Sequence, residues 1–84
     1  MPYIKQSDRN RLSFLRLEQP ANSGELNYCI TMLVKSYLDN GSGLTYQRIN
    51  DAIGALEGAK LELYRRVVAP YEGKKIQENG DVYT

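Results

Sequence analysis

The sequence predicts an all-α fold of three helices in one small domain, with a long amphipathic C-terminal helix, assembled as a dimer or higher oligomer. Three observations lead to this fold class. Apolar residues recur every three to four positions in two segments, which is the spacing of one helix face. Residues that cap helices precede both segments. The second segment is also too long for a chain of 84 residues to cover by itself.

Length and composition limit the size of the core. At 84 residues and 9.6 kDa the chain fits one domain, residues 1–84, and such a chain buries roughly 60–65% of its unfolded surface on folding. It has one cysteine, Cys29, and no histidine, so it lacks an internal disulfide and the commonest metal ligand. We therefore expect no metal and no cofactor, with a metal bound only by carboxylates as the remaining alternative. We expect self-association to supply the missing stability.

Two features of the sequence indicate location. The longest apolar run, from Cys29 to Val34, is far shorter than the roughly 20 residues of a membrane-spanning helix. The N-terminal residues, from Met1 to Lys5, lack the apolar core of a signal peptide. We therefore expect a cytoplasmic protein that makes no contact with a membrane.

The first helix is predicted between an N-terminal cap and a proline. Ser7 and Asp8 are residue types that cap helices, and Pro20 disfavours helical backbone at the residue before it. The apolar residues between these signals are Leu12, Phe14, Leu15 and Leu17. Residues 18–24 contain proline, asparagine, serine and glycine, and are predicted to form a loop.

The second helix has a start signal, an apolar face and a stop signal. Asn22 followed by Glu25 resembles a capping box, with Ser23 as the alternative cap. The apolar face consists of Leu26, Cys29, Ile30, Leu33, Tyr37 and Leu38. Within it, Cys29 is expected to be a small buried side chain. Residues 39–43 end the helix, with Gly41 as the left-handed cap.

The third helix is the main feature of the sequence. Thr45 is the predicted N-cap, and the helical pattern covers residues 46–69, before Pro70. One face, which we call the apolar stripe, carries Ile49, Ile53, Leu56, Leu63 and Val67, flanked by Tyr46, Tyr64 and Tyr71. This helix would be about 36 Å long, whereas a compact domain of this size is roughly 30 Å across. Its ends must therefore extend beyond the domain or meet another chain.

The last residues, 71–84, form a polar stretch with a turn signal at Asn79 and Gly80. Ile76, Val82 and Tyr83 could anchor this stretch on the domain or on a neighbouring subunit. An extended tail is the alternative.

A second face of the third helix carries small residues. Gly54 and Gly58 each cost about 1 kcal/mol relative to alanine inside a helix, and they lie nearly opposite the apolar stripe. Leu61 and Val68 fall close to the same edge, and we call these four residues the glycine strip. Close packing against a helix is predicted here. The partner is the first helix of the same chain or another subunit, and unexplained exposure is the remaining alternative.

One lysine interrupts the apolar stripe. Lys60 lies in its centre, close to Glu57 and Tyr64, and a buried charge is costly unless it is paired. A lysine held beside a carboxylate and a phenol could form a small-ligand or enzyme site. The simpler alternative, which we favour, is that the lysine stem covers apolar surface while its ammonium reaches water or Glu57.

A basic cluster follows on both sides of Pro70. It consists of Arg65, Arg66, Lys74 and Lys75, close to Tyr64 and Tyr71. Arginine beside aromatic rings can hold phosphates or stack on bases, so a nucleic-acid-associated regulator is an alternative function. Three glutamates are interleaved with the cluster, and the net charge of +1 lacks the basic excess of duplex-binding domains. Nucleic acid is therefore a disfavoured partner, and a solvated charged surface is the preferred interpretation.

No set of residues indicates catalysis. Gly41 and Gly43 occur without the remaining residues of a phosphate-binding loop. Glu57 and Glu62 lie on different sides of the helix, unlike the grouped carboxylates of helical nucleotide pyrophosphohydrolases. We assign no catalytic residue. The favoured function is a non-catalytic interaction or accessory protein, which acts as a homo-oligomer through a helical surface and has an unidentified protein partner.

The sequence also resembles a known family. The segments that contribute are Met-Pro-Tyr-Ile-Lys at 1–5, Gly-Glu-Leu-Asn-Tyr at 24–28, Ile-Asn-Asp-Ala-Ile-Gly-Ala-Leu-Glu at 49–57, Ala-Lys-Leu-Glu-Leu-Tyr-Arg-Arg-Val-Val-Ala-Pro-Tyr-Glu at 59–72 and Glu-Asn-Gly-Asp-Val-Tyr at 78–83. Together they resemble a family of short uncharacterised proteins from bacteria and their phages, cyanophages included. The resemblance covers nearly the whole chain, with the least support over residues 6–22. It implies a complete stand-alone protein, and it assigns no catalytic residues.

Overall fold

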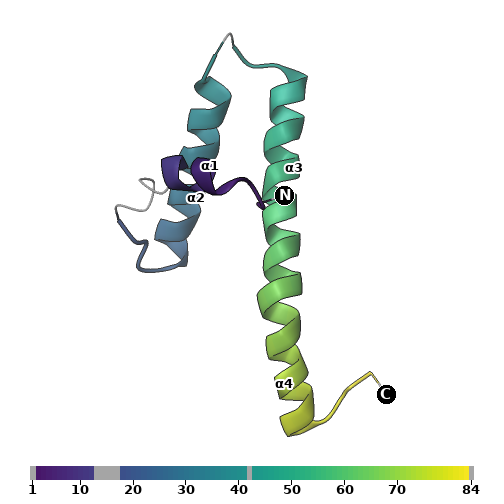
Figure 1. Cartoon of the computed structure of the whole chain (residues 1–84). Coiled ribbons are helices and arrows are strands. Elements are labelled where there is room, and N and C mark those ends of the chain that lie inside the picture. Colours follow the sequence, from purple (N-terminus) through teal and green to yellow (C-terminus); the bar gives the residue numbers. More distant parts are fainter. Residues whose placement is uncertain (1, 13–17, 42, 84) are drawn as a thin grey trace. The chain divides into compact units, whose positions relative to one another are not determined.

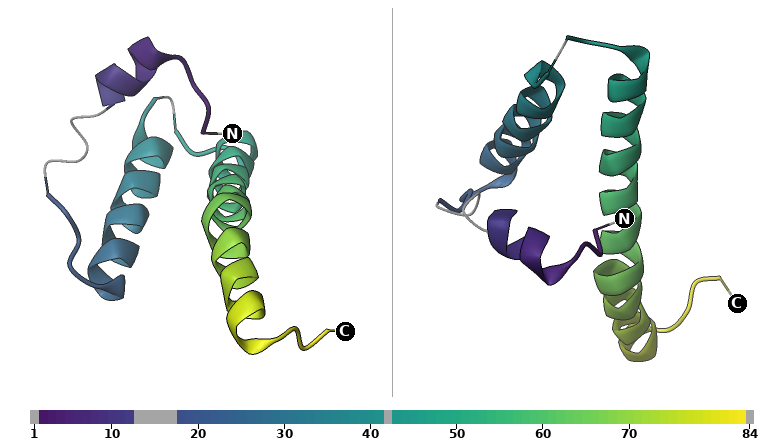
Figure 2. Two further views of the ribbon diagram at one scale, coloured as in Figure 1. Left: turned by 60° about the horizontal axis from the view of Figure 1, so that its bottom comes forward. Right: turned by 45° about the horizontal axis from the view of Figure 1, so that its top comes forward.

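The computed structural model describes residues 2–12, 18–41 and 43–83. Its elements are α1 (Gln6–Leu12), α2 (Ser23–Asp39), α3 (Tyr46–Leu63), the π-helical turn η2 (Tyr64–Val68) and α4 (Ala69–Asn79) (Figure 1). The described residues form no strand, which confirms the all-α prediction. The last three elements follow one another without a break and form one helix of 34 residues (Figure 2). We call it the long helix.

The chain divides into two compact units. One unit is Tyr3–Gly54, which holds α1, α2 and the first half of α3. The other is Ala55–Thr84 together with Met1–Pro2, and it holds the rest of the long helix. The boundary lies inside α3, where the backbone remains helical. The expectation of a single domain stays a prediction.

The first helix begins one residue earlier than its predicted caps. The N–H of Arg9 donates to the carbonyl of Lys5 at 3.0 Å, so Ser7 and Asp8 lie within the first turn of α1. A carboxylate at this position is favourable because the N-terminus of a helix carries partial positive charge. The predicted continuation through Phe14, Leu15 and Leu17 lies outside the described residues.

The second helix starts where its capping signal predicts. The Asn22 side chain accepts a hydrogen bond from the N–H of Glu25 at 2.9 Å. The Glu25 carboxylate in turn accepts one from the N–H of Ala21 at 2.8 Å. These two reciprocal bonds satisfy N–H groups that have no partner inside the helix. Asn22 is therefore the cap, and the alternative cap, Ser23, is the first residue of α2.

The turn between α2 and α3 uses glycine where the backbone requires it. α2 ends at Asp39, and Gly41 and Gly43 have φ values of +98° and +117°, a region that other residues rarely adopt. Thr45 then caps α3, because its hydroxyl accepts a hydrogen bond from the N–H of Arg48 at 3.2 Å. The predicted N-cap of the third helix and the left-handed glycine after the second are both present.

Arg48 connects the end of α2 to the first turn of α3. Its guanidinium donates a hydrogen bond to the backbone carbonyl of Tyr37 and lies 4.9 Å from the centre of the Tyr37 ring. The carbonyl belongs to the last turn of α2, where C=O groups have no helical partner. A charged donor to such a carbonyl, with a cation over an aromatic face, ties the two helix ends together.

The prediction that the long helix ends before Pro70 is wrong. The N–H of Ala69 bonds to the carbonyl of Tyr64, five residues back instead of four. A proline in a regular helix lacks the N–H and collides with the carbonyl four residues earlier. The wider π-helical turn accommodates both defects, so α4 continues to Asn79 and ends at Gly80, whose φ is +91°. The extended-tail alternative is therefore also wrong over residues 71–79.

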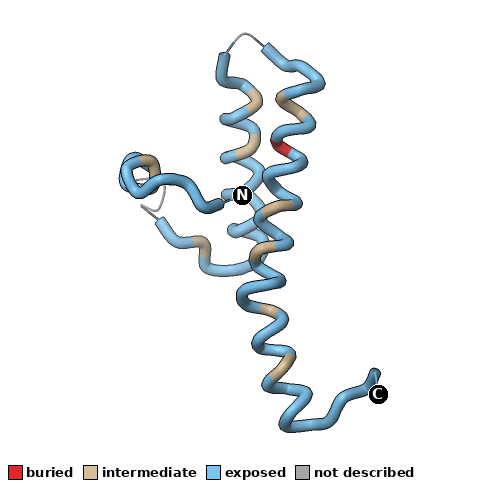
Figure 3. The backbone as a smooth tube through the Cα atoms, turned by 45° about the vertical axis from the view of Figure 1, so that its right-hand side comes forward, coloured by how far each residue is buried: buried red, intermediate tan, exposed pale blue. Residues whose placement is uncertain are grey.

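Burial within the chain is slight. Among the described residues, Ala52 on α3 is the only one that is buried (Figure 3). Cys29 is exposed, which corrects the expectation that it is a small buried side chain, because no described element covers its side of α2. No described helix is long and apolar enough to cross a membrane.

Candidate functional site

The apolar stripe of the long helix stays largely exposed. Its residues beyond the first turns are Ile53, Leu56, Leu63 and Val67, whose exposed fractions lie between 42% and 61%. Only Ile49, the residue after Arg48, is half-buried. Folding normally removes such side chains from water, at a gain of roughly 1.5–3 kcal/mol each. In the single chain, most of this gain is therefore not realised.

The apolar face of α2 is exposed in the same way. Leu26, Ile30, Leu33 and Tyr37 keep 42% to 55% of their surface in contact with solvent, and Leu38 is half-buried. Both helices of the chain that carry a clear apolar pattern thus present it to solvent. A helix that is stable in water buries its apolar face against something.

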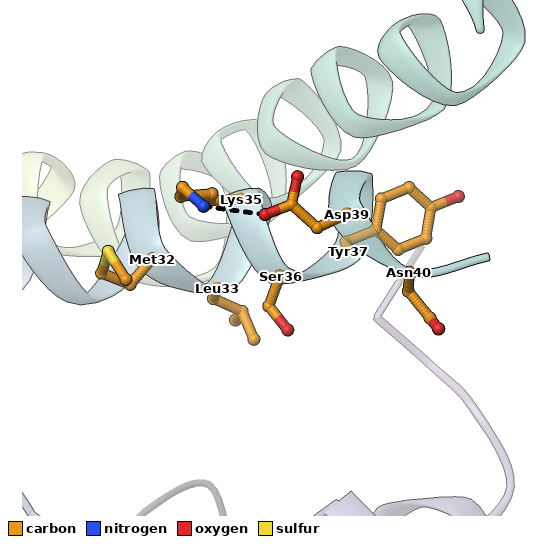
Figure 4. A pocket seen from close by; sticks show the side chains of 7 residues that line it. All are labelled: Met32, Leu33, Lys35, Ser36, Tyr37, Asp39 and Asn40. Atoms are coloured by element: carbon orange, nitrogen blue, oxygen red, sulfur yellow. Dashed lines mark hydrogen bonds and ion pairs between the residues drawn. The ribbon is translucent and has the colours of Figure 1, made fainter. Parts of the chain in front are cut away.

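A shallow depression lies along the C-terminal half of α2. It encloses about 600 Å³ and is lined by Met32, Leu33, Lys35, Ser36, Tyr37, Asp39 and Asn40 (Figure 4). All of these residues belong to one helix and its C-cap, so no second element closes the depression. The Lys35 ammonium donates a hydrogen bond to the Asp39 carboxylate at 2.8 Å. This bond, and then the charge of the carboxylate, raise the pKa of Lys35 above its ordinary value of 10.5.

The glycine strip is open at the positions that the structure describes in detail. A Cβ built on Gly54 would meet no described atom within 4 Å, so none of the described helices approaches the backbone closely there. Leu61 is 58% exposed, while Gly58 and Val68 are half-buried. The role of these four residues in packing or in a subunit contact stays a prediction.

The polar group around Lys60 consists of Lys60, Glu57 and Tyr64, and its contacts are weak. The Lys60 ammonium lies 3.5 Å from the Glu57 carboxylate, and the two side chains are 72% and 55% exposed. Tyr64 is 58% exposed, at the start of the π-helical turn. An exposed pair of this kind contributes about 0.2–1 kcal/mol. The geometry is that of a solvent-facing ion pair, and a ligand site at these residues stays a prediction.

The basic cluster is partly neutralised by its own helix. Arg65 lies 3.2 Å from Glu62, and Lys75 lies 3.2 Å from Glu78. Lys75 also lies 5.6 Å from the centre of the Tyr71 ring. A carboxylate one turn away partly cancels the positive potential of the basic group with which it pairs. That basic group therefore attracts a phosphate less strongly. Binding of nucleic acid through Arg65, Arg66, Lys74 and Lys75 also stays a prediction.

Two structural features that affect these helix faces were not predicted from the sequence. One is the Arg48 connection to Tyr37, which joins residues 11 positions apart and has no short-range pattern. The other is the π-helical turn, whose signal is a proline inside a segment that otherwise continues the helical pattern. Among the described residues, no three Asp, Glu, Cys or His side chains lie together as metal ligands would.

Comparison with known proteins identifies a family and no relative of established function. No curated protein and no solved structure matches the chain. The family model of a domain of unknown function, DUF6899, matches residues 1–82. The matched residues include the N-caps of α2 and of the long helix, the glycine strip and the π-helical turn. The chain therefore belongs to the DUF6899 family.

Proposed function

We propose that this protein is a non-catalytic helical interaction protein that acts as a homo-oligomer. One observation carries the proposal: the apolar faces of α2 and of the long helix remain exposed while Ala52 is the only buried residue among those described. Contiguous exposed apolar surface on a soluble protein marks an interaction site. The resemblance to bacterial and phage proteins supports a role in the cytoplasm of a bacterial cell or of a phage-infected one.

The lengths of the helices support the proposal that a second subunit covers the apolar faces. α2 has 17 residues and the long helix has 34, or about 26 Å against about 51 Å at 1.5 Å per residue. A helix of half the length leaves about half of the long helix without a helical partner. The helix that matches the long helix in length is its own copy in a second subunit.

The proposal is tested by mass in solution. Sedimentation equilibrium over a range of concentrations is expected to give a dimer or higher species, and the melting temperature should rise with protein concentration. Leu33→Ser on α2 and Leu63→Ser on the long helix should each weaken association, and Arg66→Ser serves as the exposed control. A monomer with a melting temperature independent of concentration would reject the proposal.

A further inference from the structure

We draw no further inference here: the strongest candidate, the exposed apolar face of α2 with the shallow depression along its C-terminal half, lies on one helix alone, and nothing in the described part of the chain shows what covers it.

Discussion

The two units of this chain differ in how their helix ends and helix interruptions are stabilised. In Tyr3–Gly54, the Asn22 and Thr45 side chains cap helix N-termini, and Arg48 takes up a carbonyl at the end of α2. In Ala55–Thr84, the helix passes through Pro70 with no side-chain hydrogen bond to the caps of η2 and α4. The first unit is organised by directed polar contacts between neighbouring segments. In the second, the helix continues through the proline by a change in backbone hydrogen bonding.

This difference shows which kind of information a short sequence carries. Caps act over three or four residues, so a side chain and its backbone partner can be recognised together. A π-helical turn forms when the residues after a proline are more stable as a continuation of the helix than as a loop. That balance involves everything the helix packs against, including any second chain.

A large effect is expected at Pro70, where the two units differ most. Pro70→Ala supplies the missing N–H and removes the ring, so residues 64–70 can return to a regular α-helix. Proline inside a helix costs about 3 kcal/mol relative to alanine; because η2 already absorbs part of this cost, we expect a gain of about 1–2 kcal/mol. Hydrogen exchange of the α4 amides measures it. Pro20→Ala, in the loop before α2, is the control and should leave the exchange of the α4 amides unchanged. Faster exchange of these amides in Pro70→Ala would contradict the stabilisation expected from removing the proline.

A nearly equal effect is expected at Arg48, the polar contact that defines the first unit. Arg48→Ala removes a charge-assisted hydrogen bond to the Tyr37 carbonyl, worth about 1.5–3 kcal/mol, and a cation–π contact worth about 0.5–1 kcal/mol at an exposed site. Allowing for overlap between the two, we expect a loss of about 2 kcal/mol in the free energy of unfolding. Urea denaturation measures it. Arg66→Ala, on the long helix, should change this free energy by no more than about 0.5 kcal/mol, and equal effects would erase the contrast between the units.

A smaller effect is expected at the α2 cap. Asn22→Ala removes the acceptor for the Glu25 N–H and should cost about 1 kcal/mol. The loss should appear as faster hydrogen exchange in the first turn of α2. Asn79→Ala, at the end of α4 that is capped by the backbone of Gly80, is the comparison and should have little effect on exchange in its own last turn. Matching changes at the two positions would mean that side-chain caps do not distinguish the units.

The smallest effect concerns Lys35 and Asp39. Their hydrogen bond raises the pKa of Lys35 above 10.5, so the stabilisation is fully present below that pH and is lost as the pH rises through the raised value. The ¹³Cε shift of Lys35, followed by NMR through the alkaline range, should titrate later than in an Asp39→Asn variant. Identical titrations in the two proteins would show that the pair is not formed in solution.

Much of the fold follows from short-range patterns, and the candidate faces follow only in part. The N-caps of α2 and α3, the apolar spacing and the glycine turn between the helices are all local features. The start of α1 and the exposure of Cys29 were not predicted correctly, because the first depends on a Lys5 carbonyl and the second on what covers α2. Apolar periodicity identifies the side of a helix that should be covered, but it does not identify the element that covers it.

The π-helical turn also has a consequence for chain length. Because η2 contains one residue more than a regular helix needs, removing one residue from 64–68 together with Pro70→Ala would leave a continuous α-helix with α4 still on its present side. Removing one residue from α3 instead would turn the whole C-terminal segment away. Combined with Pro70→Ala, a single-residue deletion is therefore expected to be silent within residues 64–68, whereas a deletion in α3 is expected to be disruptive.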